Sequence, residues 1–197
     1  MTAERRRAQL LEVTEAIVGE QGFHAVTIEA VARRAGVTRP VVYGHFGDLD
    51  RLLGALVDRE EGRAIAQLTA ILPTVAEGAA AGDRGRLLFG ALRGYLDAVR
   101  TDPVTWRLVL MPPEGAPAAL RERIARGRSA VVAHLAGLIG PGFAPGRATP
   151  DPELTARTLS ALADEAARLV LTDPEHFSVE RILAHAGWLL DQLAGTA

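Results

Sequence analysis

The stretch Thr27–Phe46, which reads TIEAVARRAGVTRPVVYGHF, decides the fold of this chain. Thr27 is a good N-cap, because its hydroxyl can accept a hydrogen bond from the next helical turn. Apolar residues then recur at the spacing of one helical face, namely at Ile28, Val31, Ala32 and Ala35. Gly36 follows where a left-handed residue ends a helix at little steric cost. The first half of the stretch therefore predicts a short helix closed by a glycine turn.

The second half predicts another short helix, capped by Thr38. Pro40 is tolerated in its first turn, where the N–H groups have no helical partner. Val42 and Phe46 lie one turn apart and would face the core. The opposite face holds Arg39, Pro40, Val41 and Gly44. Two short helices joined by a glycine turn are typical of a helix-turn-helix, whose second helix enters a DNA groove.

The charge pattern of this stretch differs from that of its flanks. No Asp or Glu occurs between Ala30 and Gly47, whereas Arg33, Arg34, Arg39 and His45 do occur there. A local lack of anions favours contact with a phosphate backbone. The net charge of the whole chain is only −2, so affinity for DNA must come from this local patch.

Composition excludes several other kinds of site. The chain has 197 residues and no cysteine, which excludes disulfides, thiolate catalysis and cysteine zinc sites. The histidines lack metal-ligand spacing; they are His24, His45, His134, His176 and His185. No nucleophile elbow, phosphate loop or metalloprotease motif is present. We expect a protein that is not an enzyme and that needs no cofactor or metal.

We expect neither a signal peptide nor a membrane span in this sequence. The N-terminus, MTAERRRAQLLEV, carries acidic residues and has no uninterrupted apolar core, which a signal peptide would need. No stretch approaches the roughly 18 apolar residues that span a membrane. We expect a soluble, cytoplasmic protein with no membrane partner.

Helical periodicity continues on both sides of the stretch and predicts an all-α fold of about nine helices. The flanking helices are expected at 3–21, 49–72, 86–100, 104–111, 117–139, 152–171 and 178–193. We divide the chain into a helix-turn-helix domain, 1–48, with three helices, and a larger helical domain, 49–197. Phe23 is expected to plug the core of the first domain. Arg5, Arg6 and Arg7 form either a solvated helix end or an arm that contacts phosphate or the minor groove.

The last two helices carry wide apolar stripes rich in Leu and Ala. We expect a two-fold homodimer with a four-helix interface, although part of each stripe must pack within its own chain. The interface residues would be Leu159, Leu162, Ala163, Ala166, Val170, Ile182, Ala186, Leu189, Leu190 and Leu193. Asp164 and Arg168 interrupt the first stripe and are interpreted as a surface ion pair at the i, i+4 spacing. A polar anchor inside a ligand cavity is the alternative.

The middle helices supply aromatic, soft and polar side chains that could line an effector pocket. These are Phe89, Tyr95, Trp106, Met111 and His134. Such a pocket would favour a mostly apolar ligand with a few polar groups. Plain core packing explains each of these residues equally well.

The pattern G-F-x-x-x-T-I-x-x-V-A-x-x-A-G-V-T, at Gly22–Thr38, is followed by Tyr43, His45 and Phe46. Together these residues resemble the DNA-binding domain of tetracycline-repressor (TetR) family regulators, over roughly residues 5 to 55. The resemblance implies a homodimeric repressor that binds a palindromic double-stranded DNA operator. It also implies that the helical domain, 49–197, binds a small effector, which releases the operator, and dimerises through its last two helices.

Carried over to this chain, the resemblance assigns a role to each matching residue. Arg39, Pro40 and Val41 match positions that meet base edges, where an Arg can bind guanine and a Val can contact a thymine methyl group. Tyr43 and His45 match positions that contact phosphate. Thr27 and Thr38 match cap threonines whose helix N-termini approach phosphate.

Two positions depart from the pattern of the family. Leu49 stands where a Lys is common, and Gly44 stands where a larger side chain often grips the backbone. Both departures predict fewer phosphate contacts and a weaker salt dependence, unless Arg51 compensates.

Two other functions stay open on the sequence. One is a helical ligand carrier or enzyme with a vestigial helix-turn-helix. The other is a non-specific architectural DNA binder, which the near-neutral net charge disfavours.

Overall fold

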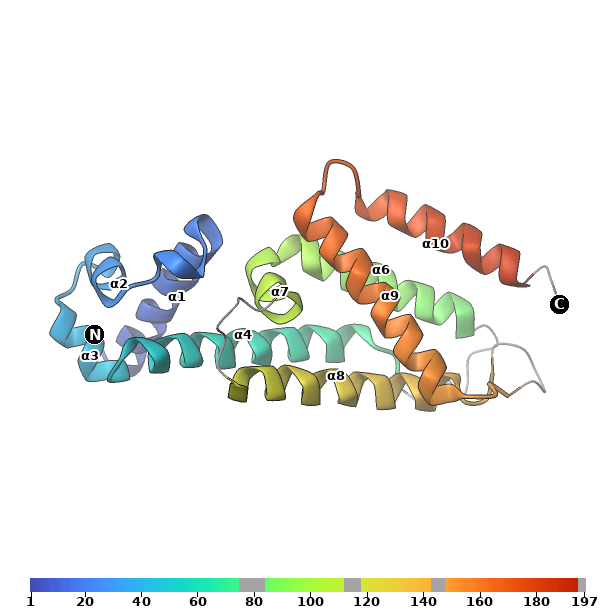
Figure 1. Cartoon of the computed structure of the whole chain (residues 1–197), viewed down its shortest axis with the longest axis horizontal. Coiled ribbons are helices and arrows are strands. Elements are labelled where there is room, and N and C mark those ends of the chain that lie inside the picture. The colour runs from blue at the N-terminus through green and yellow to red at the C-terminus, as the bar shows by residue number, and fades with distance from the viewer. Residues whose placement is uncertain (75–83, 112–117, 143–147, 195–197) are drawn as a thin grey trace.

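The computed structural model describes residues 1–74, 84–111, 118–142 and 148–194, except for the side chains of 118–121, 123 and 191–194. Within these ranges the chain forms nine α-helices, one 3₁₀-helix and no strand (Figure 1). The prediction of an all-α fold with about nine helices is therefore confirmed. No helix in these ranges is long and apolar enough to cross a bilayer.

The first three helices form one end of the molecule, which we call the head. They are α1 (Ala3–Gln21), α2 (Ile28–Ala35) and α3 (Arg39–Phe46), with the 3₁₀-helix Phe23–Ala25 between α1 and α2. Each contributes a fully buried side chain to one core, namely Leu10, Val31 and Val42. Burying an aliphatic side chain of this size contributes about 1.5–3 kcal/mol.

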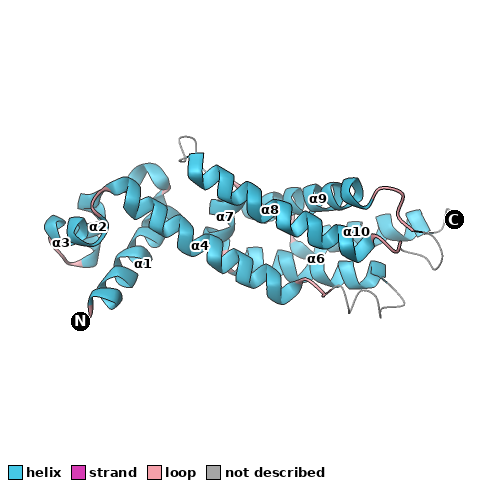
Figure 2. Cartoon of the chain, turned by 90° about the horizontal axis from the view of Figure 1, so that it is seen from below, coloured by secondary structure: helices cyan, strands magenta, loops and turns pink. Residues whose placement is uncertain are grey.

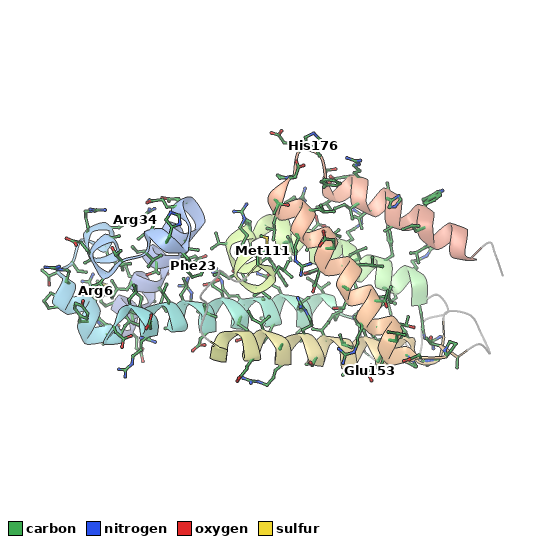
Figure 3. The ribbon with its side chains drawn as sticks, in the orientation of Figure 1. Arg6, Phe23, Arg34, Met111, Glu153 and His176 are labelled. Atoms are coloured by element: carbon green, nitrogen blue, oxygen red, sulfur yellow. The ribbon has the colours of Figure 1, made fainter. Side chains whose placement is uncertain are left out.

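Phe23 does not plug this core, contrary to expectation. Its side chain is only partly buried, and it is absent from the residues that form or line the head core. Val26, three residues later, is 4% exposed and lies in that core instead. Figure 3 places Phe23 on the side of the head that faces the rest of the molecule.

Helix α4 (Leu49–Ile71) leaves the head and runs along the remainder of the molecule (Figure 1). Asp48 caps it by accepting a hydrogen bond from the Arg51 N–H at 2.7 Å. Leu52 and Leu56 are fully buried in the head core, so the first two turns of α4 pack with the head. The boundary that we predict after residue 48 therefore falls where the chain enters α4, although the head core extends past it.

The other helices form the body. They are α6 (Arg84–Thr101), α7 (Pro103–Leu110), α8 (Ala118–Ile139), α9 (Pro152–Thr172) and α10 (Val179–Ala194). Helix α9 crosses α6 and α8, and α10 lies against α6 at the outer edge (Figures 1 and 2). One core cluster joins α4, α6, α7, α9 and α10, and a smaller one joins α8 to the start of α9.

The head and the body meet at a buried carboxylate, which we call the joint. The Glu60 side chain on α4 is fully buried and accepts a hydrogen bond from the Thr105 hydroxyl on α7 at 2.5 Å. Arg59 and Arg63 pair with Glu60 at 2.6 and 3.1 Å. The same two arginines pair with Glu15 of α1 at 2.5 and 3.1 Å. One connected network of charges therefore ties α1, α4 and α7 together.

Helices α4 and α7 share further polar contacts beyond the joint. The buried Trp106 indole donates to Gln67 Oε1 at 2.8 Å, and Gln67 Nε2 donates to Asp102 Oδ2 at 3.0 Å. Helix α1 also touches α7, because a Cβ on Gly19 would lie 2.9 Å from Val104 Cγ2. The orientation of the head is therefore set by directional contacts as well as by apolar packing.

Candidate nucleic-acid interface

Local signals in the sequence place α2 as expected. The Thr27 hydroxyl accepts a hydrogen bond from the Ala30 N–H at 3.0 Å. Gly36 ends the helix in the left-handed region, at φ 66° and ψ 34°. The predicted apolar face is buried, and it consists of Ile28, Val31, Ala32 and Ala35. Helix α2 therefore forms a fixed support for the helix that follows it.

Helix α3 presents the predicted face to solvent. Val42 is fully buried and Phe46 is 6% exposed, so these two residues anchor the helix in the head core. Arg39 and Pro40 are exposed, and Tyr43 is 50% exposed. Four other residues were predicted to contact DNA. Of these, Val41 and His45 are partly buried, and Thr27 and Thr38 are exposed. The outer face of α3 therefore offers cationic, aromatic and apolar groups to a partner.

Thr38 differs from its prediction as a cap. It occupies the N-cap position of α3, but its hydroxyl accepts no hydrogen bond from the first turn. The Val41 N–H donates to the Thr38 backbone carbonyl instead, at 3.0 Å. Within the described part of the chain, the first turn of α3 thus lacks a side-chain cap.

The stretch from Ala30 to Gly47 has no acidic residue of its own, but the fold brings an acidic residue of α1 next to it. Arg34 of α2 forms a two-pronged ion pair with Glu20 of α1, with N–O distances of 2.5 and 2.6 Å. The hydrogen bond from Arg34 lowers the pKa of Glu20 below its ordinary value. Among the described residues, Arg33 and Arg39 form no ion pair. Arg34 therefore holds α2 against α1, while Arg33 and Arg39 keep their charge for a partner.

The three arginines near the N-terminus do not act as one unit. Arg5 is exposed, and Arg6 donates to Gln9 within α1 at 2.7 Å. Arg7 reaches across to α3, where Nη1 donates to the backbone oxygen of His45 at 3.2 Å. Its guanidinium carbon lies 4.3 Å from the centroid of the Phe46 ring. Arg7 is exposed, but these two contacts hold its side chain against α3, so it is not a free arm in this structure.

The two positions that depart from the family pattern have structural explanations. Leu49 is partly buried against the head core. A Cβ on Gly44 would meet nothing within 4 Å, so a larger side chain would fit there. Arg51 is highly exposed and lies 3.5 Å from Asp48, which weakens its positive field. The expectation of a reduced phosphate grip therefore stays a prediction, with Arg51 only partly available to compensate.

In the body, the five predicted effector residues fall into two groups. Tyr95 and Trp106 are 7% and 1% exposed and pack edge to face at 5.0 Å. Phe89 and Met111 pack against the same core cluster. His134 lies apart and contacts the Pro73 carbonyl oxygen at 2.8 Å. None of the five lines either of the two hollows that follow.

The first hollow measures about 340 Å³ and lies between α6, α7 and the turn that joins α9 to α10. Its wall includes Val99, Arg107, Val170, Phe177 and Glu180. The second measures about 190 Å³ between α8 and α9. Both are surface features of the body and lie away from α3.

Asp164 of the second hollow is bound differently from the prediction. It pairs with Arg128 of α8 at 2.7 Å and accepts a hydrogen bond from the Tyr95 hydroxyl at 3.3 Å. Arg168 instead pairs with Glu165 at 3.1 Å, so the predicted Asp164–Arg168 pair is wrong. Burial, and next the charge of Asp164, raise the pKa of Tyr95 above its ordinary value, so the hydroxyl remains a donor. Asp164 is thus a polar anchor between three helices.

The predicted interface stripes divide into exposed and packed parts. The exposed predicted members are Leu162, Leu189 and Leu190, at 64%, 43% and 39% exposure. Val170 is only 6% exposed and belongs to the core of its own chain, which corrects its assignment. Partly buried members are Leu159, Ala163, Ala166, Ile182 and Ala186, and the Leu193 side chain lies outside the described residues.

Two exposed apolar residues were missed by the sequence stripes. Leu154 is 61% exposed on α9, and Trp188 is 54% exposed on α10, where it stacks on His185. Leu154 lies eight residues before Leu162, on the same face of α9. The helical spacing of Leu154 and Leu162 could have identified Leu154 from the sequence. Trp188 could have been identified because it directly precedes Leu189, a predicted interface residue.

No group of three or more histidine, aspartate or glutamate side chains among the described residues could hold a metal ion.

Comparisons with known proteins agree with this geometry. The family described as "Bacterial regulatory proteins, tetR family" matches residues 10–56. The transcriptional activator FasR of Mycolicibacterium smegmatis is 28% identical over 106 residues, which are 54% of this chain and 46% of FasR. The chain therefore spans less than half the length of this curated relative.

Solved structures share the whole fold. A TetR-like transcriptional regulator from Rhodococcus sp. RHA1 superposes with a TM-score of 0.71 at 21% identity, over 94% of this chain and 96% of that one. A putative TetR-family regulator from Rhodococcus sp. reaches a TM-score of 0.68 at 26% identity, over 95% and 97% of the two chains.

Proposed function

Because this chain is a member of the tetR family of bacterial regulatory proteins, we propose that it binds a palindromic operator as a homodimer and responds to a small effector. The observation that carries this proposal is the shape of α3. Val42 and Phe46 fix the helix in the head core, while Arg39, Pro40 and Tyr43 stay exposed on its other side. A helix held in this way can enter a major groove without losing its own packing.

Each exposed group on α3 has a fitting partner on DNA. Arg39 forms no ion pair among the described residues, so its fork of donors is available for a guanine edge. Val41 can contact a thymine methyl group. Tyr43 and His45 would contact phosphate, and the uncapped first turn after Thr38 offers unpaired N–H groups to another phosphate.

The exposed face of α9 and α10 supports dimerisation. Leu154, Leu162, Trp188, Leu189 and Leu190 are all at least 39% exposed. We propose that these side chains form one apolar patch, because a contiguous exposed apolar patch usually marks an interface. A two-fold axis through this face would present two copies of α3 to two half-sites, one helical turn of DNA apart or a multiple of it.

For the effector, the larger hollow replaces the pocket that the sequence suggested. Its volume of about 340 Å³ is in the range of small-ligand sites. Its wall combines aliphatic and aromatic groups with Arg107 and Glu180, which suits a mostly apolar ligand with a few polar groups. Part of that wall is α7, which Thr105 ties to α4 at the joint. A ligand that moved α7 would therefore act on the helix that carries the head.

The sign of regulation is proposed from the family resemblance, which implies a repressor. A dimer that covers a promoter blocks transcription, so we propose a repressor that the effector releases. A reporter gene behind the operator tests this sign, because deletion of the regulator should raise expression. Lowered expression would make the protein an activator, as the name of FasR describes that relative.

Footprinting on the DNA that flanks the gene of this protein tests the central proposal. We expect one protected palindrome, with protection at nanomolar protein and none on scrambled DNA. Equal protection of both DNAs would indicate a non-specific binder. The absence of any protection, there and in a random-sequence selection, would favour a helical ligand carrier or enzyme with a vestigial helix-turn-helix.

A further inference from the structure

Arg7 of α1 is the one arginine of the N-terminal cluster that touches α3. It contacts the end of α3 opposite Arg39, through the His45 backbone oxygen at 3.2 Å and the Phe46 ring at 4.3 Å. We call these two contacts the Arg7 clasp. Neither contact is local in sequence, since 38 residues separate Arg7 from His45.

Helix α3 has few other restraints on its pose. It is only eight residues long, and its first turn lacks a side-chain cap. Gly44 lies in its second turn, and Gly47 ends it at φ +84°. A helix this short is not stable alone, so tertiary contacts must hold it. Those contacts include the buried Val42 and Phe46 side chains and the clasp.

The clasp suits the end of the helix on which it acts. The last carbonyl groups of a helix have no partner within it, and Arg7 satisfies the carbonyl of His45. A positive charge at a helix C-terminus also interacts favourably with the helix dipole. The guanidinium plane covers the Phe46 ring, which is only 6% exposed. Arg7 thus restrains both the rotation of α3 and its seating in the head.

We propose that Arg7 is a positioning residue for DNA recognition. It holds the backbone of His45 and the ring of Phe46, and so fixes the angle at which α3 presents Arg39. It does not contact DNA itself. This inference rests on the proposed function, because the pose of α3 matters only if α3 reads DNA.

The test compares Arg7→Ala with Arg5→Ala, a matched control. Arg5 lies on the same turn of α1 and is exposed, and its side chain has no hydrogen bond or ion pair among the described residues. Affinities are measured by fluorescence anisotropy on the operator and on a scrambled duplex, at several NaCl concentrations. We expect Arg7→Ala to weaken operator binding by roughly 5- to 70-fold at most, the size of one exposed cation–π contact and one hydrogen bond. Arg5→Ala controls for the loss of one positive charge beside the clasp, and its matched readout is the hydrogen exchange of α3 described below.

Two further readouts separate positioning from direct contact. The observed binding constant falls as salt rises, and a lost arginine–phosphate contact would make the slope of log K against log salt shallower by about 0.9 per chain. We expect an unchanged slope, because in this proposal Arg7 neutralises no phosphate and its loss changes no counterion release. The ratio of operator to scrambled affinity should fall, which a merely less stable protein would not show. Arg7→Lys should recover only part of the affinity, since lysine lacks the planar face.

A measurement without DNA separates this inference from the proposed function. Hydrogen exchange of the α3 amides in the free protein should be faster in Arg7→Ala and unchanged in Arg5→Ala. If hydrogen exchange of the α3 amides is unchanged in Arg7→Ala, then Arg7 does not restrain α3, and the inference is wrong regardless of the DNA-binding results. A shallower salt slope that Arg7→Lys restores would overturn it in favour of a phosphate contact. A third outcome is that the exchange result holds but the wild-type protein binds no DNA. The proposed function then fails. The clasp would remain a structural contact, and its role in positioning α3 for DNA would be overturned.

Discussion

The substitution Thr105→Val removes one hydroxyl from the joint and leaves the shape of the side chain nearly unchanged. The Thr105 hydroxyl donates to Glu60 at 2.5 Å, and both side chains are fully buried. Arg59 and Arg63 still pair with the Glu60 carboxylate after the change. The loss is therefore one hydrogen bond to a buried charged group.

A hydrogen bond to a charged group contributes about 1.5–3 kcal/mol, and we expect Thr105→Val to lower the free energy of unfolding by that amount. For a chain of this length the thermal midpoint should fall by roughly 3–12 °C. Urea unfolding followed by circular dichroism measures the free energy, at one fixed protein concentration, because a dimer makes the midpoint depend on concentration.

Thr69→Val is the matched control on the same helix as Glu60. Its hydroxyl is exposed and donates only to the carbonyl of Ile65, one turn away, at 2.8 Å. That change should stay within about 0.5 kcal/mol of wild type. A double-mutant cycle of Thr105→Val with Glu15→Gln should show a coupling of about 0.5–3 kcal/mol, because both residues belong to one network. Equal free energies for the Thr105 and Thr69 variants, or a coupling of zero, would refute the account of the joint.

Three further outcomes are expected. Leu162→Glu should halve the molecular mass of the protein measured by light scattering, because Leu162 is 64% exposed in one chain and would be buried in the proposed dimer. The control is Ile65→Glu, at a site on α4 that is 49% exposed, and it should leave the molecular mass unchanged. The hydrogen bond from Arg34 lowers the pKa of Glu20, so this pair should stabilise the protein above the ordinary glutamate pKa and lose its effect as the pH falls through the lowered value. In an NMR titration, Arg34→Ala should return the pKa of Glu20 toward its ordinary value, and an unmoved pKa would contradict the pairing. Gly44→Ala should raise the unfolding free energy by about 0.5–1 kcal/mol, since a Cβ there meets nothing and alanine favours a helix; a loss in denaturant unfolding would show a hidden clash.

The elements that the sequence predicted well are those specified by neighbouring residues. Helix α2 follows from the Thr27 cap, an apolar face and the left-handed Gly36, all within ten residues. The anchored face of α3 follows in the same way from Val42 and Phe46. Such signals act within one or two turns and do not depend on the rest of the fold.

The features that the sequence did not predict depend on contacts between distant residues. Arg34 meets Glu20 only because α2 packs on α1, which offsets a lack of anions measured along the chain. Asp164 had a plausible partner one turn away but pairs with Arg128 of another helix. Aromatic residues of the middle helices, such as Trp106, could be assigned to a pocket or to the core only once the helices were packed.

The most direct test of the central claim is the affinity of Arg39→Ala for the operator and for a set of duplexes that each change one base pair. Arg34→Ala serves as the control, since Glu20 already occupies that guanidinium. The account predicts that Arg39→Ala loses about 1–3 kcal/mol and no longer distinguishes bases at one position of each half-site. Arg34→Ala should keep that discrimination. If Arg39→Ala discriminates among all the duplexes as the wild-type protein does, then α3 does not read DNA through its exposed face.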